Sequence, residues 1–165
     1  MPFTEANFEN AILEIFRDLL GYEYLYGPDV VRDFAEPLCP EILEDALVRI
    51  NPSLPRAAID EAIARIRTHE SGSLARKNAR FTDMLQNGVA VNYFDGSEQR
   101  AGLVRLVDYD LPMRNRFTVA NQWTVEERSV RRADIVVFVN GLPLVVVELK
   151  SPSREATDVS EAYAQ

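Results

Sequence analysis

The spacing of apolar residues divides this chain into a helical first half and an extended second half. Apolar positions recur every three or four residues in four stretches, which predict amphipathic helices at 7–20, 41–50, 56–70 and 74–86. The alternating tyrosines at positions 22, 24 and 26 predict a short strand after the first helix. From residue 89 onward the period falls to two, which predicts strands at 89–94, 101–109 and 117–126.

The most apolar stretch, DIVVFVNGLPLVVVELK at 134–150, predicts a β-hairpin. Its two runs are joined at Asn140-Gly141, a dipeptide strongly favoured in tight hairpin turns. Side chains alternate along a strand, so the second run has one face formed by Leu144, Val146, Glu148 and Lys150 and another formed by Val145, Val147 and Leu149. Because both faces are apolar, we expect this strand in the middle of a covered sheet. The whole pattern predicts one α/β domain over residues 1–165, with a mixed central β-sheet flanked by helices concentrated in the N-terminal half.

Three charged residues gather at the open end of this predicted hairpin. Glu148 and Lys150 leave the second strand on the same face, and a tight turn would place Asp134 opposite them. Two carboxylates suit a hard divalent cation, above all Mg²⁺. A desolvated lysine can orient or deprotonate a water molecule, so the chemistry implied is phosphodiester hydrolysis. The alternative is that Glu-x-Lys forms an ordinary solvated strand end.

Composition and charge narrow the class of protein. The chain is 47% hydrophobic and 27% charged, as in globular proteins, and no apolar window is long enough to span a membrane. The N-terminus has no secretory signal, and the single cysteine, Cys39, fits a reducing cytoplasm, where we expect a buried or half-buried thiol without catalytic function. The net charge of −8 disfavours strong autonomous DNA binding, because cationic side chains supply most non-specific affinity for DNA.

Longer segments of the sequence around these residues resemble those of a known protein family. The pattern Asp134…Glu148-x-Lys150 resembles the PD-(D/E)xK nuclease motif. The phrases RINPSLP, NARFTDMLQNGVAV, LVDYDLPMRNRFTVANQWTV and RRADIVVFVNGLPLVVVELKSP resemble the N-terminal nuclease domain of the R (restriction and translocation) subunit of type I restriction–modification enzymes. The resemblance covers residues 9–165. Ala133 stands where the family usually has a proline before the first acid.

The resemblance implies a restriction-endonuclease-like core that cuts double-stranded DNA with Mg²⁺, without sequence specificity of its own. Asp134 and Glu148 would bind the metal, the carbonyl of Leu149 would offer a third oxygen, and Lys150 would position or activate the attacking water. Gln165 matches the glutamine of a family Gln-x-x-x-Tyr element that supports the site, which suggests that the chain is the N-terminal fragment of a longer subunit. ATP would be used by motor domains of that subunit, since this chain contains no P-loop motif. The modification and specificity subunits would be its other partners.

Further candidates carry less specific signals. Glu9 is the preferred acid of the first helix to approach the metal, with a solvated helix surface as its alternative. Two basic groups could contact the DNA backbone or a neighbouring part of the protein, or could be ordinary surface charge. They are Arg76, Lys77 and Arg80, and Arg128, Arg131 and Arg132. Two other functions remain open for the chain. It could be a docking or regulatory module with a latent nuclease site, or a different PD-(D/E)xK nuclease that acts in DNA repair.

Overall fold

The computed structural model describes residues 4–68, 72–126 and 129–150, and its chain forms two compact units. The first unit comprises Met1–Leu38, Phe117–Phe138 and Leu142–Gln165. The second comprises Cys39–Arg116 together with Val139–Gly141, and is therefore inserted into the sequence of the first. The expectation of a single nuclease domain over residues 1–165 stays a prediction.

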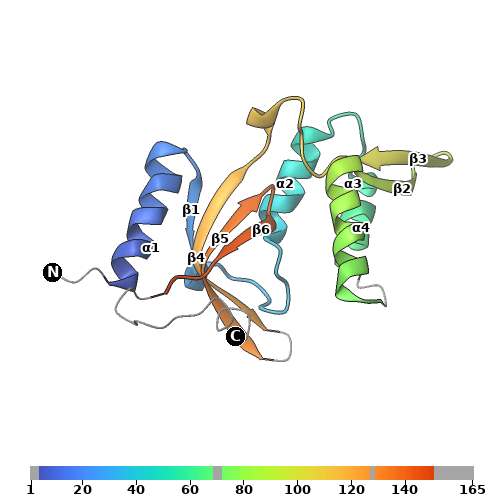
Figure 1. The fold of residues 1–165 in the computed structure, drawn as a ribbon. Coiled ribbons are helices and arrows are strands. Elements are labelled where there is room, and N and C mark those ends of the chain that lie inside the picture. The colour runs from blue at the N-terminus through green and yellow to red at the C-terminus, as the bar shows by residue number, and fades with distance from the viewer. Residues whose placement is uncertain (1–3, 69–71, 127–128, 151–165) are drawn as a thin grey trace. The chain divides into compact units, whose positions relative to one another are not determined.

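The first unit is built on a mixed four-stranded sheet (Figure 1). Its elements are α1 (Glu5–Glu14), the π-helical turn η1 (Ile15–Leu19), β1 (Glu23–Tyr26), the 3₁₀ turn η2 (Gly27–Asp29), β4 (Phe117–Glu126), β5 (Val130–Val139) and β6 (Leu142–Val147). The strand order is β1-β4-β5-β6, and β1 runs parallel to β4. The two residues between β5 and β6 allow only an antiparallel pair. The predicted α/β class with a mixed sheet and flanking helices is confirmed.

Helix α1 covers part of this sheet through its apolar face. Leu13 is buried against Val119 of β4 and Ile135 and Val137 of β5, and Ile12, Phe16, Tyr22 and Val147 pack around this cluster. The helix begins two residues earlier than the apolar spacing predicts because Thr4 caps it. The Thr4 side chain accepts a hydrogen bond from the Asn7 amide, and the Asn7 side chain accepts one from the Thr4 amide.

The second unit contains three helices and a separate hairpin. Its elements are α2 (Pro40–Ile50), α3 (Arg56–Arg67), α4 (Leu74–Asn87), β2 (Val89–Phe94), β3 (Gln99–Val104) and the 3₁₀ turn η3 (Pro112–Arg114). Strands β2 and β3 form an antiparallel two-stranded sheet, and α3 packs against β2. The apolar spacing predicts all three helices to within a few residues of these bounds. None of the described helices is long and apolar enough to cross a membrane.

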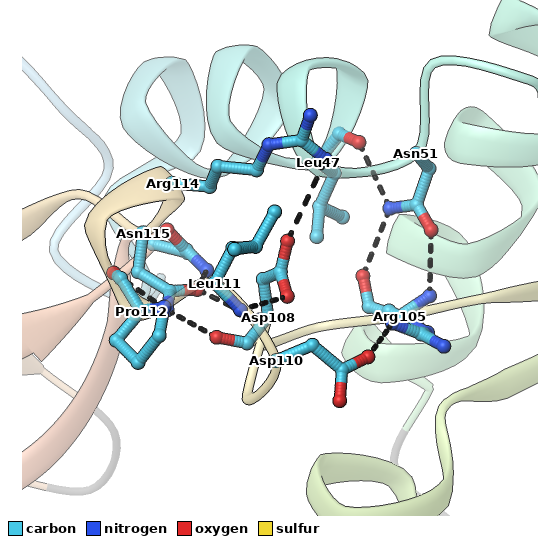
Figure 2. Close-up of polar contacts among 10 residues, drawn as sticks. Leu47, Asn51, Arg105, Asp108, Asp110, Leu111, Pro112, Arg114 and Asn115 are labelled. Carbon is cyan, nitrogen blue, oxygen red and sulfur yellow. Dashed lines mark hydrogen bonds and ion pairs between the residues drawn. The ribbon is translucent and has the colours of Figure 1, made fainter.

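The predicted strand at 101–109 is wrong in its second half, since β3 ends at Val104. The chain beyond is a loop whose backbone is bonded to side chains instead of a neighbouring strand (Figure 2). The Asn51 side chain donates to the Arg105 carbonyl and accepts from the Arg105 amide, each at 2.9 Å. The buried Asn115 side chain accepts from the Asp108 amide and donates to the Asp108 carbonyl, each at 2.8 Å. These amide side chains take the place of strand partners.

The predicted turn at Asn140-Gly141 is confirmed. Both residues have positive φ, 53° and 78°, as a two-residue hairpin turn demands. The fully buried Asn140 side chain donates to the Leu106 carbonyl and to Asn115 Oδ1, and accepts from the Arg116 amide. A Cβ on Gly141 would lie 2.6 Å from backbone atoms of the neighbouring α2 segment, so only glycine fits there.

The second strand of this hairpin is less buried than the sequence predicts. Within the described residues β6 is the outer strand of the sheet, and Leu144, Val145 and Val146 are 38%, 49% and 59% exposed. The expectation of a central, covered strand is therefore wrong for β6. The two interior strands are β4 and β5, and Ile135 and Phe138 of β5 are fully buried. Valine-rich sequence favours an extended backbone, but the order of strands depends on pairing with distant segments. Cys39 is buried, as predicted.

Candidate active site

The predicted acid on β5 lies beside the predicted Glu-x-Lys stretch. The Asp134 side chain is half-buried, and its Oδ2 accepts a hydrogen bond of 2.7 Å from the Leu149 amide. This contact joins the side chain of one strand to the backbone that directly follows the other. It fixes the Asp134 carboxylate beside the segment in which Glu148 and Lys150 flank Leu149. The geometry agrees with the placement expected from a two-residue turn, while the catalytic roles stay predictions.

The charged groups near Glu148 share one electrostatic environment. Partial burial raises the pKa of the Glu148 carboxyl, and the negative charge of Asp134 raises it further. The ammonium of Lys150 opposes that rise, while Glu5, in the first turn of α1, adds to it. Glu148 and Lys150 are both exposed at the end of the hairpin. Three acids and one lysine, drawn from α1, β5 and the end of β6, therefore interact at this place.

Glu9, the preferred α1 acid, is held by β4. Its carboxylate accepts a hydrogen bond of 2.6 Å from Asn121 Nδ2 and bonds of 3.2 and 3.3 Å from Gln122 Nε2. The Tyr24 hydroxyl donates to Asn121 Oδ1 at 2.9 Å, and burial followed by the charge of Glu9 raises the pKa of Tyr24. The acid of α1 whose charge acts on Glu148 is instead Glu5, which the sequence pattern does not single out. The sequence feature that could have indicated partners for Glu9 is the polar pair Asn121-Gln122 inside the otherwise largely apolar strand β4.

The backbone of β4 is strained at this polar cluster. Gln122 has a φ of 53°, in the left-handed region that a residue with a side chain seldom occupies within a strand. Gly27 packs so closely that a Cβ there would lie 2.6 Å from the Asn121 carbonyl oxygen. Such conformations persist when the surrounding contacts hold them. Here the bonds to Glu9 and the close approach of Gly27 hold the strained segment of β4.

Arg131 and Arg132 are exposed at the start of β5. Gln165 and Arg128 lie outside the described residues. The basic group of α4 lies in the second unit, with Arg76 and Lys77 exposed and Arg80 half-buried.

The donor set at this site fits Mg²⁺. Among the residues that the structure describes, no three or more His, Cys, Asp or Glu side chains are grouped closely enough to hold an ion by themselves. Mg²⁺ does not require such a cage, because it is commonly held by one or two carboxylates and completes its shell with water and substrate phosphate oxygens. Asp134 and Glu148 would be that pair of hard oxygen ligands.

A mixed sheet that carries an acid on one hairpin strand and Glu-x-Lys after the next is typical of the restriction-endonuclease-like class of fold. Comparison with known proteins agrees with this class. The chain belongs to the family described as the N terminus of the type I restriction enzyme R protein, whose model matches residues 2–165. The resemblance inferred from the sequence phrases is thereby confirmed.

Individual relatives carry names of the same kind. The chain is 38% identical over 172 residues to the type I restriction enzyme HindI endonuclease subunit of Haemophilus influenzae, a match that covers 98% of this chain and 16% of the relative. It is 30% identical to the putative type I restriction enzyme MjaIXP endonuclease subunit of Methanocaldococcus jannaschii, over 90% of this chain and 15% of that protein. The chain thus spans only a small part of the length of these relatives.

Proposed function

We propose that this chain is a Mg²⁺-dependent endonuclease domain that hydrolyses phosphodiester bonds of double-stranded DNA without sequence specificity of its own. It would act as part of an ATP-dependent type I restriction complex in the cytoplasm. The observation that carries the proposal is the hydrogen bond from the Leu149 amide to Asp134, which brings Asp134 to the Glu148–Lys150 stretch. Membership of the type I restriction R protein family supports it.

Each residue has a defined part in this proposal. Asp134 and Glu148 would hold Mg²⁺, with the Leu149 carbonyl as a further oxygen. When bound, the ion would polarise a phosphoryl oxygen and lower the pKa of a coordinated water. The Leu149 amide keeps the Asp134 carboxylate in one orientation by occupying its Oδ2. Lys150 would position the attacking water or accept its proton, and Gln165 would orient the site.

The proposed partners follow from the family. The rest of the subunit would supply the ATP-driven motor domains, and the modification and specificity subunits would supply recognition of a target sequence. These assignments rest on the resemblance to the family. The relatives, which are much longer than this chain, are named only as endonuclease subunits of type I restriction enzymes.

The test is cleavage of plasmid DNA with Mg²⁺ and ATP by the complete complex, comparing the native chain with Asp134→Ala and Lys150→Ala. We expect each substitution to lower the cleavage rate by at least about a hundredfold, since each removes a group that acts on the reacting atoms. ATP hydrolysis should stay at the native rate in both variants. Arg17→Ala serves as a control because it removes an exposed charge of the same unit that is paired with Asp18. Native cleavage by both variants would contradict the proposal.

One observation favours a second candidate, a docking or regulatory module with a latent site. The first unit contains 15 acidic and 7 basic residues, so it carries the whole net charge of −8 and repels DNA until cations intervene. This candidate predicts that Asp134→Ala leaves cleavage unchanged but lowers assembly with the other subunits. A repair nuclease of the same superfamily is less well supported, because the relatives are named as type I restriction endonuclease subunits.

A further inference from the structure

The first half of α4 carries a cluster of positive charges with no acidic residue near it in the sequence. Arg76, Lys77 and Arg80 lie within two turns, and the sequence has no acidic residue from position 71 to position 82. Arg76 and Lys77 are exposed, and within the described part of the chain neither has an ion pair. Three other exposed arginines of the second unit are paired with acids: Arg56 with Glu44 and Asp60, Arg100 with Asp95 and Glu98, and Arg105 with Asp110. Arg49 is also exposed and has no ion pair among the described residues, but no other basic residue lies within four positions of it in the sequence.

These charges also oppose the polarity of their own helix. The N-terminal end of a helix carries a partial positive charge, so acidic residues stabilise it there and basic residues do not. Helices α1 and α2 follow this rule, with Glu5 and Glu41 in their first turns. Helix α4 has no acid in its first turn and places Arg76 and Lys77 there or directly after it. A local rule broken without a compensating interaction is expected at functional surfaces.

The distribution of charge over the chain indicates a partner for this group. The second unit contains 11 acidic and 11 basic residues and is neutral, whereas the first unit, with the candidate active site, carries the net charge of −8. The net negative charge of the first unit repels a polyanion, so cations of the neutral second unit would help to bind it. Arg76 and Lys77 are exposed, are adjacent in sequence and have no ion pair within the described ranges, and such side chains suit the closely spaced phosphates of a duplex.

We propose that the N-terminal half of α4 contacts the phosphate backbone of double-stranded DNA through Arg76, Lys77 and Arg80. The proposed interaction rests on the nuclease function, because that function defines the polyanion. It is independent of base sequence, since phosphate contacts position a protein on DNA without reading bases. It gives the chain an affinity for DNA that its net negative charge would not give.

The test compares two double variants from which the same charge is removed. Arg76→Gln with Lys77→Gln removes two adjacent exposed cations of α4, whereas Arg49→Gln with Arg56→Gln removes two exposed cations elsewhere in the second unit. Binding of a fluorescein-labelled duplex of random sequence is measured by anisotropy in EDTA, which excludes cleavage, between about 50 and about 200 mM salt. Thermal unfolding of each variant is measured in parallel.

We expect the α4 variant to bind about tenfold more weakly for each phosphate that it no longer neutralises, with a salt dependence shallower by about one unit of log–log slope per phosphate. Its unfolding temperature should equal or exceed that of the native chain, because charges unfavourable to the helix are gone. The control variant should keep the native slope. Three outcomes would overturn the proposal. Both variants could bind equally well, the native chain could fail to bind the duplex at low salt, or weaker binding could be accompanied by a fall in unfolding temperature.

The same measurements separate this inference from the proposed function. Weak binding by the α4 variant, beside native cleavage by the Asp134→Ala and Lys150→Ala forms of the complete complex, would support the α4 interaction and refute the proposed nuclease site. Loss of cleavage in Asp134→Ala together with native binding by the α4 variant would support the nuclease and refute the α4 interaction. Weaker binding of an acidic protein surface, with unchanged binding of DNA, would assign α4 to a protein partner and overturn the inference.

Discussion

At the scale of single residues, Asn140 does more than form a turn. Its side chain is fully buried and makes three hydrogen bonds, to the Leu106 carbonyl, to Asn115 and from the Arg116 amide. Its φ of 53° is one that asparagine tolerates better than most residues. The choice of asparagine therefore satisfies both the backbone of the turn and the polar groups of the adjacent loop.

Asn140→Ala should lower the free energy of unfolding by about 3 kcal/mol, since it leaves buried polar groups without partners and places alanine at a positive φ that it tolerates poorly. Asn140→Gly should cost about 1 kcal/mol less, because glycine adopts this φ without strain. Urea denaturation of the two variants beside the native chain measures both effects. Native stability of Asn140→Ala would show that water satisfies the polar groups left by the side chain.

At the scale of elements, the β2–β3 hairpin depends on one acidic residue. Asp95 accepts hydrogen bonds from the Ser97 amide, the Ser97 hydroxyl and the Glu98 amide, and it pairs with Arg100. The Arg100 guanidinium, followed by the Glu98 amide, holds the pKa of the Asp95 carboxyl far below its usual range. The hairpin is therefore tightened by the ionised form of Asp95.

Asp95→Asn should lower the unfolding temperature at neutral pH, and the difference from the native chain should shrink in acid. Because the folded pKa of Asp95 is depressed, its contribution is fully present above the pKa of an unfolded aspartate, about 4, and is lost as pH falls below that value. Thermal unfolding between pH 7 and pH 3 measures the trend. A difference that stays constant over this range would mean that the charge of Asp95 does not tighten the hairpin.

The elements also show which features of the fold a sequence can predict. The bounds of β4 are predicted to the residue, since alternation over Phe117–Glu126 is a local signal. The Asn140-Gly141 turn is equally local. The outer position of β6 and the end of β3 at Val104 could not be predicted, because strand order and the side-chain bonds of Asn51 and Asn115 join segments far apart in sequence. The hairpin pattern predicts Asp134 beside the Glu-x-Lys stretch, but the action of Glu5 on Glu148 arises only when α1 packs on the sheet.

At the scale of the whole molecule, charge is segregated between the two units. The carboxylates of the candidate site belong to the unit that carries the entire net charge of −8. A divalent cation bound between Asp134 and Glu148 would relieve repulsion between them, which is one cause of the raised pKa of Glu148. Metal binding and folding are therefore expected to be linked.

Mg²⁺ should raise the unfolding temperature of the native chain by a few degrees once its concentration reaches about ten times the dissociation constant. Asp134→Asn should abolish this rise, because it removes a charged ligand while it keeps a side-chain oxygen near the Leu149 amide. Scanning calorimetry with NaCl at matched ionic strength separates binding from screening. A rise of the same size in Asp134→Asn would locate the ion elsewhere.

The insertion of the second unit between β1 and β4 has a consequence for the order of folding. Glu23 pairs with Thr118, so the parallel pair β1–β4 closes a loop that contains the chain of the second unit from Cys39 to Arg116. Distant pairings of this kind are slow, because the entropy of loop closure is lost before the pairing forms. During synthesis the helices and hairpin of the second unit emerge before β4, β5 and β6 exist. The sheet that carries Asp134 can therefore form only after the helices and hairpin of the second unit have been synthesised. Until then, α1 and β1 lack the strands against which their apolar side chains pack.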